Sequence, residues 1–198
     1  MIRYSLVLLF CLVSMALAQA QFVTVPNTIR TPGGNIAINQ RIYMPIHYAN
    51  SPFNPKFDFV VTLKNDSVLT FSSKVNAEDK KMYLEQRVKK QKRKIFPNET
   101  KSIIGISDNW GKIPGIPADS CWLFKIYTRA INCYSSVPVM DAELAIAIQY
   151  GDQAPIVPLT KKNLEAITGT DDKKIVKWLA KDKLTKVIEY YNEKMLVK

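Results

Sequence analysis

Histidine is almost absent from this chain of 198 residues, in which His47 is the only one. Catalytic dyads and triads with a histidine base would depend on this residue alone, and no nucleophile motif such as Gly-x-Ser-x-Gly lies beside it. Zinc sites need about four ligands, and Cys121, Cys133 and the distant His47 do not suggest such a set. The sequence also contains no glycine-rich phosphate loop and no Asp-x-Asp-x-Asp-Gly calcium loop. We therefore expect no metal, no cofactor and no histidine-based catalysis.

Cysteine is scarce too, with Cys11, Cys121 and Cys133 as the full set. Cys11 follows Phe10 rather than a small residue, which argues against a lipoprotein. Residues 121–127 and 131–137 read as a hairpin in which Lys125 faces Cys133, and this register separates Cys121 from Cys133 by roughly 13 Å along the ribbon. A different turn would permit a disulfide. The alternatives are thus a Cys121–Cys133 bridge or two separate buried thiols.

Long apolar runs are limited to the first 20 residues. There a single positive charge, the apolar segment 5–17 and the small-residue sites at Ala18 and Ala20 form the pattern of a secretory signal peptide. An uncleaved N-terminal anchor is the alternative. Cleavage near Ala18 or Ala20 would leave a secreted or periplasmic chain without a transmembrane segment.

Positive charge is what the sequence has in excess, with a formal net charge of +11. It is densest over residues 80–94, where the only acid is Glu85 and the basic residues are Lys80, Lys81, Arg87, Lys89, Lys90, Lys92, Arg93 and Lys94. Such a run binds polyanions by releasing their counterions. The expected partners in this compartment are lipid head groups, lipopolysaccharide or acidic glycans, and not nucleic acid. The alternatives are an edge strand whose lysines prevent aggregation, charge dispersed for solubility, or a precursor cleavage site at Lys92-Arg93.

The middle of the chain has β patterns. Residues 21–56 are predicted as an extended N-terminal segment with a short strand over 35–43. Segments 57–64 and 67–75 flank Asn65-Asp66, a dipeptide suited to a two-residue hairpin turn. Pairing Lys64 with Ser67 puts Phe59 and Val61 on one face and Leu69 and Phe71 on the other. Both faces would be partly apolar, which favours a small barrel or a covered sheet.

The next segments leave one alternative open. Residues 76–96 fit a helix or strands, and we favour strands because 95–97 and 103–106 also read as short strands. Residues 107–120 are predicted as turns, and 142–150 as the last strand. Thr160 and Gly169 predict a helix over 161–168, Thr170 or Asp171 begins a second helix, and 184–195 has the spacing of a third.

The resulting fold class is α+β: a small antiparallel β-barrel or sandwich-like sheet followed by two or three C-terminal helices. The predicted organisation is a signal peptide over 1–20, the extended segment over 21–56, a β-rich domain over 57–150 and a helical tail over 151–198.

Four segments carry a resemblance: VTLKNDSVLT (61–70), KIFPNETKSI (94–103), PLTKKNL (158–164) and EYYNEK (189–194). In this order they resemble an uncharacterised group of secreted or periplasmic proteins of Bacteroidota, with a β-rich domain and a helical tail. The resemblance covers most of residues 57–194. It implies a periplasmic or cell-surface location and assigns no catalytic residue.

Two functions follow as hypotheses. The first is a non-enzymatic, envelope-associated binding module that uses the basic run for polyanions. The alternative is a secreted hydrolase with carboxylate chemistry, for which Asp119, Asp141 and Glu143 flank the predicted hairpin.

Overall fold

The computed structural model describes residues 22–31, 34–43, 55–89 and 91–196, with side chains from residue 55 onward. The predicted signal peptide, Cys11, His47 and Lys90 lie outside the described residues. The first described element is the antiparallel hairpin of β1 (Phe22–Thr31) and β2 (Gly34–Tyr43). Strand β2 confirms the strand predicted over 35–43.

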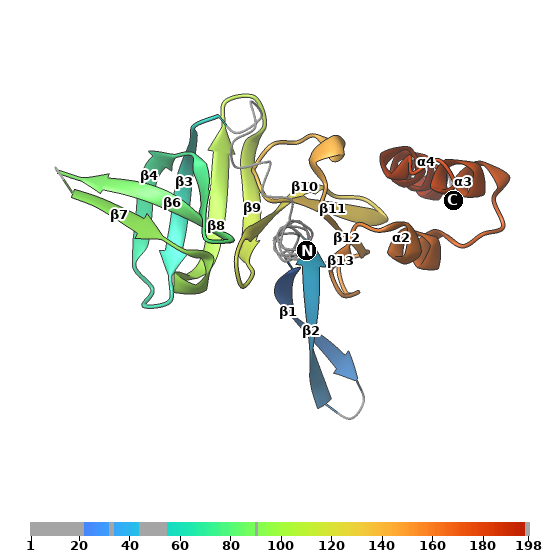
Figure 1. The fold of residues 1–198 in the computed structure, drawn as a ribbon, viewed down its shortest axis with the longest axis horizontal. Coiled ribbons are helices and arrows are strands. Elements are labelled where there is room, and N and C mark those ends of the chain that lie inside the picture. Colours follow the sequence, from blue (N-terminus) through green and yellow to red (C-terminus); the bar gives the residue numbers. More distant parts are fainter. Residues whose placement is uncertain (1–21, 32–33, 44–54, 90, 197–198) are drawn as a thin grey trace, which may run out of the picture.

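The centre of the fold is an eight-stranded antiparallel sheet in the order β13-β12-β11-β10-β9-β8-β3-β4 (Figure 1). Its strands are β3 (Phe57–Leu63), β4 (Val68–Ser73), β8 (Thr100–Ser107), β9 (Gly111–Pro117), β10 (Trp122–Tyr127), β11 (Ile131–Ser135), β12 (Ala147–Tyr150) and β13 (Val157–Pro158). Within the described chain this sheet stays open, with β13 and β4 at its edges. The α+β class is confirmed, whereas the closed-barrel alternative is wrong.

A second, three-stranded sheet is formed by β5 (Val75–Glu78), β6 (Lys81–Val88) and β7 (Gln91–Ile95). The segment that fitted a helix or strands thus forms strands, as favoured from the sequence. Val75, Met82, Leu84 and Ile95 are fully buried in the same core as Phe59. This sheet therefore covers one end of the larger sheet. Two 3₁₀ turns lie between strands: η2 (Pro97–Glu99) between β7 and β8, and η3 (Ala142–Leu144) between β11 and β12.

The β3–β4 hairpin differs from the prediction by one residue in register. Thr62 pairs with Val68, and the turn spans the three residues 64–66, with Asp66 at a φ of 66°. A three-residue turn that ends in a left-handed residue is a common hairpin connection. Because side chains alternate along a strand, the shift moves Leu69 and Phe71 to the buried face of Val61 and Phe59. The hairpin has one buried face and one wetter face, contrary to the prediction.

Strand β9 occupies part of the segment predicted as turns. It lies between β8 and β10, although it contains Pro114 and Gly115. Gly115 is required by packing: a Cβ there would lie 2.8 Å from both the Phe124 ring and Ile103 Cγ2. The glycine thus marks a close approach of a large ring to the backbone, not a turn.

Three helices follow the sheet: α2 (Lys161–Thr168), α3 (Lys173–Leu179) and α4 (Leu184–Leu196). Helix α2 begins and ends as predicted, with the Thr160 side chain accepting from Asn163 N and Gly169 at a φ of 73°. The N-cap of α3 is Asp172, one residue beyond the predicted positions.

Helix α4 is attached to the sheet by Asn192, which is 2% exposed. The β10–β11 ladder ends where Tyr127 pairs with Cys133, so it does not extend to Ile131. Ile131 N donates to Asn192 Oδ1 at 2.7 Å, and Asn192 Nδ2 donates to Ile131 O at 3.1 Å. The side-chain amide thereby supplies the hydrogen bonds that a neighbouring strand would otherwise make.

Candidate functional site

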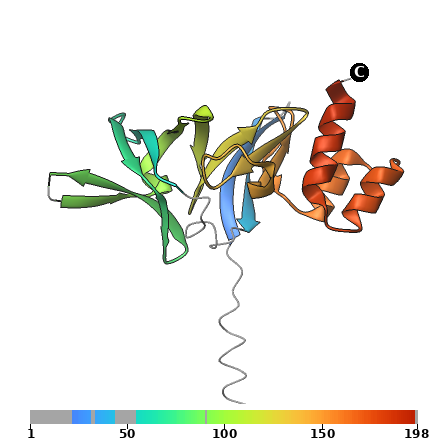
Figure 2. The same ribbon diagram turned by 90° about the horizontal axis from the view of Figure 1, so that it is seen from above.

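Strands β6 and β7 form an arm that projects from the end of the molecule opposite the helices (Figures 1 and 2). In this arm Arg87 pairs with Lys92, and Val88 with Gln91. Arg87, Lys89, Lys92 and Arg93 are all exposed. The arm therefore presents the distal half of the basic run to solvent.

The structure does not bring all the predicted basic residues together. Cross-strand pairing places Arg87, Lys92 and Lys94 on one face of the arm, and Arg93 on the other. Lys80 and Lys81 lie at the opposite end of β6, roughly 20 Å from Arg87 at the usual rise of a strand. The expected cluster is thus reduced to the residues of the arm itself.

Acidic side chains neutralise part of this charge. Glu85 accepts from Lys92 Nζ at 3.2 Å and pairs with Arg87 Nε at 3.3 Å. Hydrogen bonding from Lys92, and then from Arg87, keeps the pKa of Glu85 below its usual value against the opposing effect of desolvation. Arg93 pairs with Glu99, and Lys94 with Glu78.

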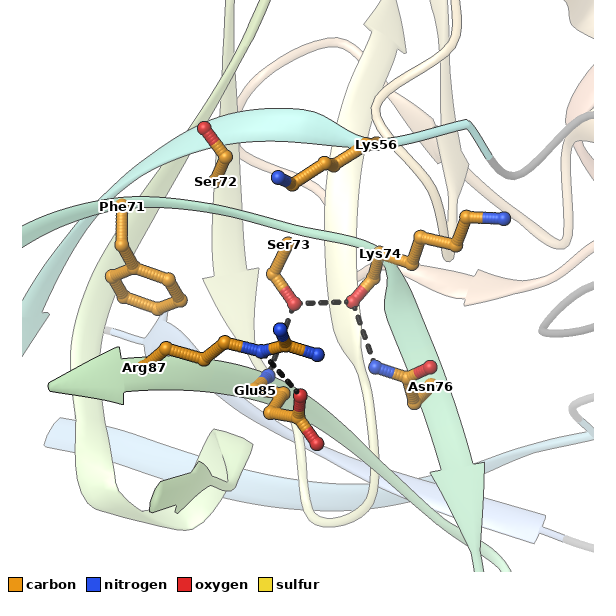
Figure 3. Close-up of a pocket in the computed structure, with 8 residues that line it drawn as sticks. All are labelled: Lys56, Phe71, Ser72, Ser73, Lys74, Asn76, Glu85 and Arg87. Atoms are coloured by element: carbon orange, nitrogen blue, oxygen red, sulfur yellow. Dashed lines mark hydrogen bonds and ion pairs between the residues drawn. The ribbon is translucent and has the colours of Figure 1, made fainter. Parts of the chain in front are cut away.

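A groove of about 500 Å³ opens between β4 and β6, where the arm meets the body. Its lining comprises three cations, one acid, an aromatic ring and three small polar side chains: Lys56, Lys74, Arg87, Glu85, Phe71, Ser72, Ser73 and Asn76 (Figure 3). Lys56 and Lys74 form no ion pair with any described carboxylate. The groove is therefore basic despite the presence of Glu85.

Hydrogen bonds fix the floor of the groove. Ser73 is 4% exposed, and its hydroxyl accepts from Glu85 N at 3.0 Å and donates to Lys74 O at 2.7 Å. Asn76 Nδ2 donates to the same carbonyl at 3.1 Å. These bonds, drawn in Figure 3, join the end of β4 to β5 and β6. They hold Arg87 and Lys74 beside one opening.

Both cysteines downstream of Cys11 are free thiols. Tyr127 pairs with Cys133 in place of the predicted Lys125, so the predicted register is wrong. Cys121 precedes Tyr127 by six residues, roughly 20 Å of strand, which is beyond the reach of a disulfide. Burial raises the pKa of each thiol to about 12. The disulfide alternative is thus not realised, and the buried thiols are unsuited to nucleophilic chemistry.

The carboxylates proposed for hydrolysis, Asp119, Asp141 and Glu143, line neither the basic groove nor a second groove beside α3 and α4. Asp141 caps η3 by accepting from Glu143 N at 2.9 Å, and Asp119 is exposed. The second groove contains Asp171 and Asp172. Hydrogen bonds from Lys194, Lys174 N and Tyr190 hold the pKa of Asp172 at about 2. A general acid needs a raised pKa, so Asp172 is unsuited to that role.

Within the described ranges, no three His, Cys, Asp or Glu side chains are grouped to hold a metal ion. No helix in these ranges has the length and apolar character needed to cross a membrane. Comparisons with models of protein families, with curated proteins and with solved structures found no match.

The basic run was visible in the sequence as a local excess of charge, but the groove was not. Lys56 precedes β3, Lys74 follows β4, and Arg87 is the penultimate residue of β6. Only the folding of the second sheet against the edge of the first brings them together. No spacing in the sequence signals this contact.

Proposed function

We propose that this chain is a secreted or periplasmic binding module of the cell envelope that attaches to anionic polymers through the β6–β7 arm. The supporting observation is the projection of the arm, which leaves Arg87, Lys89 and Lys92 exposed at its outer end. A projecting strand pair can lie along an extended polyanion without rearrangement of the body.

The arm acts by charge and not by shape. If Arg87, Lys89 and Lys92 each contact one anionic group, binding releases about three counterions. Raising the salt from about 50 to about 200 mM should then weaken binding about 20- to 40-fold, by the slopes known for nucleic acids. Glu85 limits this affinity because it competes for Arg87 and Lys92.

The test is retention of the chain lacking residues 1–20 on beads coated with dextran sulfate, as a function of salt. The double variant Lys89→Glu and Lys92→Glu should lose retention. The matched control, Lys177→Glu and Lys181→Glu, makes the same change in net charge on exposed positions in and just after α3. Equal loss in both variants, or retention that does not depend on salt, would refute the role of the arm.

A further inference from the structure

The groove between β4 and β6 offers more than positive charge. The Nη atoms of Arg87 and the Nζ atoms of Lys56 and Lys74 are donors left free by the described contacts. Asn76 uses its amide nitrogen on Lys74 O, so Asn76 Oδ1 remains available as an acceptor. Phe71 adds a half-buried apolar ring to the wall. An occupant that fits must therefore carry an anionic group, hydrogen-bond donors and an apolar face.

We propose that this groove binds one acidic sugar residue of an anionic glycan; this inference rests on the proposed function and names the class of polymer. A uronate or sulfated sugar has an anionic group for the guanidinium of Arg87. Its hydroxyl groups can donate to Asn76 Oδ1, and the C–H face of its ring can cover Phe71. In Figure 3 the side chains of Phe71, Ser73 and Arg87 lie on the same side of β4, whereas Lys56 lies on the other side of this strand.

Glu85 favours a sugar over a more highly charged chain. Its carboxylate lies within the groove and would repel a polyphosphate or a phosphodiester backbone, which also lack donors for Asn76 Oδ1. A sugar residue with one anionic group can donate hydroxyl hydrogen bonds to Glu85 instead. The acid in the basic groove therefore acts as a filter for anions that also carry donors.

The groove and the arm can bind one continuous chain. Arg87 belongs to both, and Lys92 shares Glu85 with it on the same face of the arm. A glycan seated in the groove can therefore continue outward over Lys92. In this arrangement the arm supplies salt-dependent attraction and the groove supplies selectivity.

Calorimetric titration of the chain lacking residues 1–20 tests the inference with three probes: tetragalacturonate, the neutral galactose tetramer and linear tetraphosphate. We expect tetragalacturonate to bind at least tenfold more tightly than either of the others. Phe71→Leu and Asn76→Ala should each weaken tetragalacturonate binding at least threefold and leave tetraphosphate binding unchanged. Phe96→Leu, which alters an aromatic ring outside the groove, is the matched control, and thermal melts verify folding.

The relative affinities of the unmodified chain for the three probes test the sugar inference even if a variant fails to fold. Tetraphosphate binding as tightly as tetragalacturonate would overturn the sugar inference. If the double variant Lys89→Glu and Lys92→Glu then no longer binds tetragalacturonate or tetraphosphate, the proposed function still stands. If no anionic probe binds, or if the arm variant binds normally, the proposed function itself fails.

Discussion

Replacing Asn192 by leucine removes the side-chain amide that links helix α4 to the sheet while keeping a similar volume. The variant leaves the N–H and C=O groups of Ile131 buried without the partners they have at 2.7 and 3.1 Å. An unsatisfied buried polar group costs about 1–3 kcal/mol, and the leucine side chain recovers part of that cost. We expect a loss of about 3 kcal/mol in the free energy of unfolding.

Urea unfolding followed by circular dichroism measures this loss. With an m-value of about 2 kcal/mol/M, the midpoint should fall by about 1.5 M. Glu193→Leu is the control, because Glu193 is the exposed neighbour of Asn192 on the same helix. If the two variants differ by less than about 0.5 kcal/mol, the amide does not substitute for a strand and the reasoning fails.

Three further predictions concern other parts of the fold. Gly115→Ala should destabilise the protein by about 1–3 kcal/mol, because its Cβ would meet the Phe124 ring at 2.8 Å; an unchanged melting temperature would show that the ring can move aside. In a Cys11→Ser chain, Cys121 and Cys133 should not react with a thiol reagent at pH 8 until urea is added, since burial raises their pKa to about 12; rapid labelling of the native chain would contradict this. Asp172 has a pKa of about 2 in place of 3.8, so its stabilising effect is complete above about pH 4 and is lost as the pH falls toward 2. The difference in melting temperature between the natural chain and Asp172→Asn should accordingly vanish over that interval, and a difference independent of pH would refute the role of the carboxylate.

The parts of the fold that local chemistry decides were predictable from the sequence. Helix α2 follows directly from a threonine cap and a terminal glycine. The β3–β4 register was not predictable, because Asn65-Asp66 suits both a two-residue turn and the three-residue turn that forms. The three-residue turn is favoured because its register buries Phe71 and Leu69 beside Phe59 and Val61, which is a tertiary effect.

The candidate site divides in the same way. The basic run is a local property and was found as such, but its distribution over two faces and two ends of β6 depends on the strand pairing. Its neutralisation by Glu99 and Glu78 depends on the pairing of chain segments outside the run. The groove needs Lys56, Lys74 and Arg87 to meet across the edge of a sheet, which no local pattern encodes.

The two buried thiols shift the risk of oxidation from the folded protein to the newly made chain. Cys121 and Cys133 are 12 positions apart in sequence, and a flexible loop of that length closes readily, so an oxidant can join them before β10 and β11 pair. The native ladder then cannot form, because it holds the two sulfur atoms far apart. Under oxidising conditions folding and oxidation would therefore compete, and the yield of protein refolded under such conditions should rise when a reductant is present. Once folded, the chain protects both sulfur atoms by burial alone.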